Sequence, residues 1–205
     1  GVINLGNVTK AYPLDLDTPL SGILRANIDT SFDMEAIENN VFERIKASGT
    51  MNITNFVFSS DAMNQPMNIT KMDMTFNPST VSLNAFDAST GKSDLSAKGS
   101  IQNLLGFVMS NKNLQGNFEL YSNTFVVTDF MVEDATSSET KTADAPSTEA
   151  LKIPEFLDCT INAVAKTVVY DNLNLKDVKG TLLIKDQQAT IKDLTSSLFN
   201  GKLAV

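Results

Sequence analysis

Apolar and polar residues alternate along most of this chain with a period of two. Met72, Met74 and Phe76 are separated by Asp73 and Thr75. Such alternation is typical of strands that have one face against apolar material and the other in water. It therefore predicts a mainly β fold, with a curved and mostly antiparallel sheet that forms a groove or an open sandwich.

Turn signals separate the alternating runs. Asn77-Pro78-Ser79 has proline where a β-turn favours it, and Ser89-Thr90-Gly91-Lys92 is rich in turn-forming residues. Short strands divided by such signals predict hairpins. We expect one hairpin turn at Asn77-Pro78 and another near Gly91.

One segment has the period of a helix instead. Ile37, Val41 and Ile45 lie on one face of a helix spanning about 34–46. Asp33 is a suitable N-cap, and Gly49 follows the expected end. The sequence thus predicts one helix within the β architecture.

The composition changes between residues 133 and 150, where small and polar residues dominate and aromatic residues are absent. A segment of this kind buries too little apolar surface to offset its ordering entropy, so we expect a disordered polar insert. The predicted organisation is a β segment with one helix at 1–132, the insert at 133–150, and a continuing β segment at 151–205. We expect both ends of the chain to lie inside a longer protein.

Composition narrows the functional classes. The chain has no histidine, one cysteine (Cys159) and a net charge of −8. Histidine-dependent nucleophilic catalysis and histidine-ligated metal sites are therefore excluded for the isolated chain. Nucleic-acid binding would need a basic stripe, which is absent. We expect no enzymatic activity, no cofactor, no metal and no nucleic-acid partner.

The chain is rich in flexible and aromatic apolar residues, with 12 Phe and 8 Met. They suit an ordinary core, but methionine also adapts to irregular ligands, so a lining for a chain-like ligand is the second interpretation. Alternation places each apolar set on one face of its own strand, and the hairpins would align the sets into one strip. The candidate apolar lipid-contact residues are Met72, Met74, Phe76, Val81, Leu83, Ala85, Leu95, Ala97 and Ile101.

Several short segments, in this order, resemble the C-terminal region of the AsmA family of bacterial envelope proteins. They include Ala47-Ser48-Gly49-Thr50-Met51-Asn52-Ile53, Phe76-Asn77-Pro78, Leu114-Gln115-Gly116-Asn117-Phe118, Leu175-Lys176-Asp177-Val178-Lys179-Gly180-Thr181-Leu182 and Leu198-Phe199-Asn200-Gly201-Lys202-Leu203. The resemblance covers most of the chain from about Ser21.

The resemblance implies a periplasmic protein with an inner-membrane anchor outside this segment and a role in outer-membrane biogenesis. Large members of the family are similar to chorein-type bridge-like lipid transfer proteins, whose curved sheets hold lipid tails in an apolar groove. Lipid acyl chains and other envelope proteins are the partners implied. The alternative, from a different functional class, is a structural or protein-binding β module of the envelope with no lipid ligand.

Overall fold

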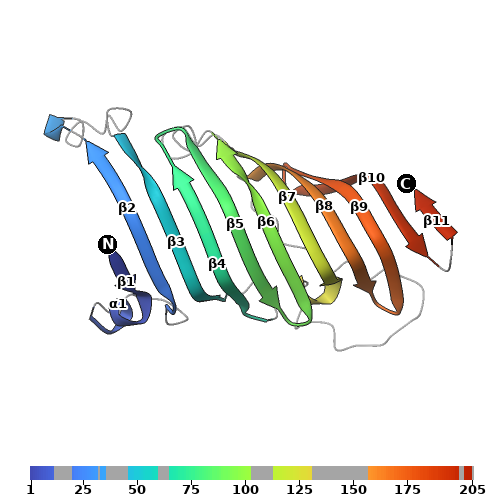
Figure 1. Cartoon of the computed structure of the whole chain (residues 1–205). Helices are drawn as coiled ribbons and strands as arrows, with labels where there is room; N and C mark the ends of the chain where they lie inside the picture. Colours follow the sequence, from blue (N-terminus) through green and yellow to red (C-terminus); the bar gives the residue numbers. More distant parts are fainter. Residues whose placement is uncertain are drawn as a thin grey trace, which may run out of the picture.

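The computed structural model describes residues 1–11, 20–31, 33–35, 46–59, 65–102, 113–130, 157–198 and 201–204. Its strands form one 11-stranded sheet in which each strand lies beside the next in sequence (Figure 1). The strands are β1 (Val2–Asn4), β2 (Ile23–Ser31), β3 (Lys46–Phe58), β4 (Met67–Phe76), β5 (Thr80–Thr90), β6 (Ser93–Gln102), β7 (Leu114–Val126), β8 (Leu157–Tyr170), β9 (Leu173–Lys185), β10 (Gln188–Leu198) and β11 (Gly201–Ala204).

The described residues include the α-helix α1 (Leu5–Ala11) and the 3-10 helix η2 (Val127–Phe130). Between described elements, the substantial contacts join neighbouring strands, apart from α1 against β1 and η2 against β8. Neither helix is long and apolar enough to span a membrane, in the part of the chain that is described. The described molecule is thus essentially a single layer of strands, and the predicted mainly β, mostly antiparallel architecture is confirmed.

The two hairpin turns lie at the predicted positions, Asn77-Pro78 and Gly91. At the β4–β5 turn, the Asn77 side-chain oxygen accepts hydrogen bonds from the backbone N–H groups of Ser79 and Thr80, at 3.0 Å each. This arrangement replaces the backbone partners that the chain loses as it reverses. At the β5–β6 turn, Gly91 has a φ of 53°, a conformation that glycine adopts at little cost.

The helix expected at about 34–46 falls mainly outside the described residues. Met34 and Glu35 are helical, whereas residues 36–45 are not described. Lys46 is the first residue of β3 and pairs with Ser31 of β2, so the expected C-terminal boundary is wrong. The reason is that Lys46 already takes part in the cross-strand ladder, which satisfies its backbone without a further helical turn.

All neighbouring strands pair antiparallel except β7 and β8, which are parallel from Leu114↔Leu157 to Val126↔Val169. This pair joins the two predicted β segments, 1–132 and 151–205, into one sheet. The expected insert at 133–150 lies outside the described residues.

Irregular positions interrupt several strands. The β4–β5 register shifts between Ile69 and Lys71 and again between Asp73 and Met74, which leaves Thr70 on β4 and Asn84 on β5 as extra residues. Asn55, Asp177 and Asp193 have positive φ within β3, β9 and β10. Asn and Asp tolerate this conformation better than other non-glycine residues, and such bulges bend and twist a strand.

Candidate functional site: a two-faced sheet

The sheet has one apolar face, which follows from its register because directly paired residues lie on the same face. One row of paired residues crosses seven consecutive strands. It consists of Met51, Met74, Leu83, Gly99, Phe118, Ile161 and Leu182, on β3 to β9 in order. We call the side that carries this row the apolar face.

Further rows lie parallel to the first on the apolar face. On β6 the alternating residues Leu95, Ala97, Gly99 and Ile101 each belong to a different row. The row through Ile101 contains Phe76, Val81, Ile101, Gly116, Cys159 and Ile184, and the row through Ala97 contains Ile53, Met72, Phe86, Ala97, Leu120 and Ala163. With strands about 4.8 Å apart, each row from β3 to β9 is about 30 Å long.

The row through Leu95 is the most buried part of the apolar face. Ile69, Ala88, Leu95 and Ala165 expose 6–8 % of their surface. Ser122 of β7, which pairs with Ala165, is 1 % exposed, and its hydroxyl has no hydrogen-bond partner. The other three rows consist mainly of half-buried side chains. The side chains of the apolar face are therefore buried along one row and only partly buried along the other three.

Eight of the nine residues expected to form the strip lie on the apolar face. These are Met72, Met74, Phe76, Val81, Leu83, Leu95, Ala97 and Ile101. Leu95 belongs to the buried row, whereas the other seven are half-buried.

Ala85 is the exception, and its assignment to the strip is wrong. Ala85 pairs with Asp73, whose neighbours Met72 and Met74 lie on the apolar face. The extra residue Asn84 reverses the alternation of β5, so Phe86 takes the place expected for Ala85 by pairing with Met72 and Ala97. Simple alternation could not reveal this reversal, because Val81, Leu83 and Ala85 follow it without interruption.

The aromatic ring of Phe118 shapes the middle of the apolar face. A Cβ atom added to Gly99 would lie 2.5 Å from the ring, and one added to Gly116 would lie 2.6 Å from it. The ring therefore occupies the space that side chains on β6 and β7 would need. Gly99 and Gly116 allow Phe118 to lie close to the sheet, which sequence alternation alone did not indicate.

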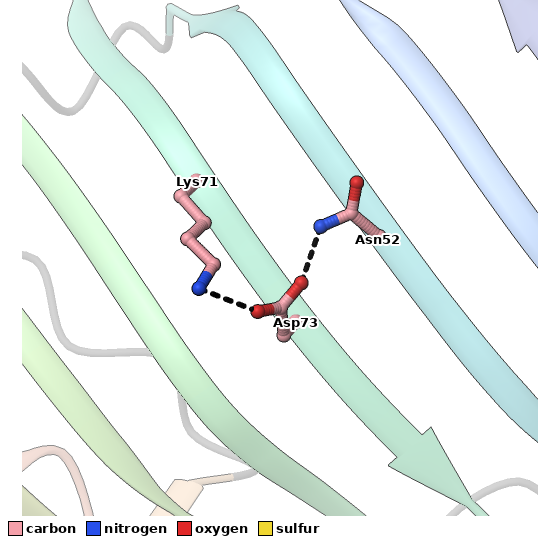
Figure 2. Close-up of polar contacts among 3 residues, drawn as sticks. All are labelled: Asn52, Lys71 and Asp73. Carbon is pink, nitrogen blue, oxygen red and sulfur yellow. Dashed lines mark hydrogen bonds and ion pairs between the residues drawn. The ribbon is translucent and has the colours of Figure 1, made fainter.

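The opposite side, which we call the polar face, carries hydrogen-bonded and ion-paired side chains. Figure 2 shows Asp73 between Lys71, whose ammonium lies 2.9 Å away, and Asn52, whose amide donates to the Asp73 carboxylate. The hydrogen bond from Lys71, followed by that from Asn52, lowers the pKa of Asp73. Farther along the sheet, Lys98 and Glu119 form an ion pair at 3.0 Å.

Hollows on the polar face are shallow. One hollow of about 560 Å³ lies over Ala85, Ser96, Lys98, Tyr121 and Val164. Among the described residues, no group of three or more His, Cys, Asp or Glu side chains could hold a metal ion. The Cys159 thiol is buried on the apolar face, and burial, followed by the nearby Asp158 charge, raises its pKa.

No family model, curated protein or solved structure matches the chain. The arrangement that remains for a functional interpretation is the sheet itself: a broad apolar face and a polar opposite face.

Proposed function

We propose that this chain is a segment of an AsmA-like periplasmic protein, anchored in the inner membrane outside this segment, that takes part in outer-membrane biogenesis by binding or conducting lipid. The observation that supports the proposal is the incompletely buried apolar face, whose rows continue across seven strands. Soluble proteins seldom leave a contiguous apolar patch of this size uncovered unless it binds something.

The dimensions of the apolar face suit acyl chains. Its rows are about 30 Å long, while one leaflet of a bilayer holds acyl chains within about half of a 30 Å hydrocarbon core. Each CH₂ group removed from water contributes roughly 0.8 kcal/mol, so about ten such groups contribute about 8 kcal/mol before the entropic cost of binding. An acyl chain therefore needs no specific polar contact to be held.

Side-chain chemistry also favours a ligand of variable shape. Met51, Met72 and Met74 lie next to one another on β3 and β4. Methionine has flexible torsions and a polarizable sulfur, so it can adapt to different acyl-chain positions.

The test compares two substitutions that introduce the same charge on opposite faces of β5. Leu83→Asp places a carboxylate in the central apolar row, whereas Ser82→Asp places one on the polar face, where Ser82 pairs with Thr75 and Ser100. The readouts are native mass spectrometry of co-purified lipid and binding of a fluorescent fatty acid after delipidation. We expect Leu83→Asp to abolish binding and Ser82→Asp to preserve it, with circular dichroism verifying the fold of both.

A parent chain that binds no lipid would contradict the proposal. So would a folded Leu83→Asp variant that binds as well as the parent.

The second candidate is a structural or protein-binding β module of the envelope without a lipid ligand. The buried row through Ile69, Ala88 and Leu95 favours it, because part of the apolar face already serves as a core. A parent chain without lipid affinity would leave this function as the better supported one.

A further inference from the structure

The polar face has two neighbouring hollows over strands β5 to β8. The first, over Tyr121, has a volume of about 560 Å³, and the second, over Asn117, has a volume of about 460 Å³. Each lies within the range of about 300–1,000 Å³ that is typical of small-ligand sites. The two hollows adjoin each other, and we call them together the polar trough. The residues that line both hollows are Asn84, Lys98, Glu119 and Asn162.

The hollow over Tyr121 forms because small side chains lie among long ones. Ala85 and Ser96 line it on β5 and β6, beside the longer side chains of Lys98 and Tyr121. Ala85 lies on the polar face only because the extra residue Asn84 reverses the alternation of β5. The reversal that removes Ala85 from the apolar face therefore opens space on the polar face.

Tyr121 presents an aromatic surface that is fixed in position. Its hydroxyl donates to the Asn123 side-chain oxygen at 3.0 Å, and the Lys166 ammonium lies 5.7 Å from the centre of its ring. The residue is 37 % exposed. Lys166 follows Val164 on β8, on the side away from Glu119, so the ring surface toward Glu119 is left for a ligand in the trough.

The polar groups of the trough supply both donors and acceptors. Lys98 and Glu119 form their ion pair between the two hollows, with side chains that are 64 % and 67 % exposed. The Asn84 amide donates to a threonine hydroxyl of β4 at 3.4 Å, which leaves its carbonyl oxygen as an acceptor. The Asn162 carbonyl oxygen accepts from Thr181 at 3.0 Å, which leaves its NH₂ group as a donor.

We propose that the polar trough binds a chain of uncharged hexopyranose sugars. A pyranose ring has an apolar face of C–H groups, which packs against the aromatic ring of Tyr121. Its edge carries hydroxyl groups that both donate and accept, which matches the amides and the ion pair. Two consecutive sugar rings occupy the two hollows, and the shallow trough lets the chain continue beyond them.

Other classes of ligand fit the trough less well. An anionic ligand would need unpaired cations, but Lys98 is paired with Glu119, and the Asp87 carboxylate also lines the trough. An extended peptide adds to the edge of a sheet, whereas the trough lies on the face of strands that already have neighbours on both sides.

The first experiment measures binding of cellohexaose, maltohexaose and chitohexaose to the 205-residue chain by isothermal titration calorimetry. We expect at least one of them to bind with a Kd of about 1 mM or tighter. Tyr121→Ala should weaken binding by about tenfold or more, and Tyr121→Phe much less, because only the phenylalanine keeps the ring. Tyr170→Ala is the matched control, since Tyr170 is 48 % exposed at the end of β8, outside the trough.

The second experiment fills the trough instead of removing a contact. Ala85→Phe places a large side chain in the hollow over Tyr121 and should abolish binding. Ser89→Phe is the matched control, because Ser89 is exposed on the same face of β5 and lines neither hollow. Circular dichroism verifies the fold of every variant.

These outcomes are independent of lipid binding. Binding that is weakened in Tyr121→Ala and Ala85→Phe, and kept in Tyr170→Ala, Ser89→Phe and the apolar-face variant Leu83→Asp, would support the polar trough. A chain that binds none of the three oligosaccharides would overturn the proposal. So would binding that Tyr121→Ala leaves unchanged, because the sugar would then lie elsewhere on the molecule.

Discussion

Replacing Gly91 by alanine should destabilise the sheet, because the added methyl group displaces the carboxylate of Asp129. Asp129 of η2 is 8 % exposed, and it accepts hydrogen bonds from the Lys92 N–H at 2.9 Å and the Ser93 hydroxyl at 2.7 Å. The Ser93 hydroxyl oxygen in turn accepts one from the N–H of Val126. These contacts attach the end of β7 to the β5–β6 turn.

A Cβ atom at position 91 would lie 2.3 Å from a carboxylate oxygen of Asp129, so that side chain must move. The positive φ of Gly91 adds roughly 1 kcal/mol of backbone strain for alanine. Displacing Asp129 removes the closer acceptor of the buried Ser93 hydroxyl and leaves it only the Val126 carbonyl oxygen at 3.4 Å, at a cost of about 1–3 kcal/mol. We expect Gly91→Ala to lower the free energy of unfolding by about 3 kcal/mol in total.

A double-mutant cycle in urea separates the two contributions. Asp129→Ala alone should cost about 2 kcal/mol, and adding Gly91→Ala to it should cost only the backbone strain of about 1 kcal/mol. The coupling energy is then about 2 kcal/mol. If the two effects instead add to within about 0.5 kcal/mol, the steric contact with Asp129 does not account for the destabilisation.

Three further predictions concern other positions. Asn55 has a φ of 55°, which glycine adopts freely and valine does not. Asn55→Gly should therefore leave the free energy of unfolding unchanged or raise it by up to about 1 kcal/mol, whereas Asn55→Val should lower it by about 1–2 kcal/mol, as measured by thermal unfolding. Asn77→Ala should cost about 1 kcal/mol in urea unfolding and Asn77→Asp much less, since only the aspartate keeps an acceptor for the turn. Burial raises the pKa of Asp94, but the hydrogen bonds that it accepts from the backbone N–H groups of Asn123 and Thr124 and from the Asn123 side chain together lower it below its usual value. The contribution of Asp94 to stability should therefore be present above about pH 4 and lost at lower pH. Asp94→Asn should weaken that pH dependence in acid titrations, and an unchanged profile would show that other groups cause it.

The sequence could not predict that strands β7 and β8 pair in parallel. Alternation along β7 and β8 is the same whether the strands are parallel or antiparallel, because both arrangements place residues i and i+2 on one face. The direction depends on the connection between them, and that connection carries no hairpin signal. Only the three-dimensional pairing, Leu114↔Leu157 onward, shows that the strands run the same way.

The conformation of the β9–β10 turn was equally hard to predict. The positive φ values of Asp186 and Gln187 determine the hydrogen-bonding direction of the strand, and neither residue forms a strong type I′ signal such as Asn-Gly.

The sequence by itself determined the β class, the turns at Asn77-Pro78 and Gly91, and the faces of most strands. These depend on local chemistry: side-chain direction alternates with a period of two, and turn residues satisfy or relax the backbone where it reverses. The tertiary structure decided which face Ala85 joins, where the apolar face is buried and how the rows continue from strand to strand. Those features depend on register shifts such as the one at Asn84, where one extra residue reverses every later side chain.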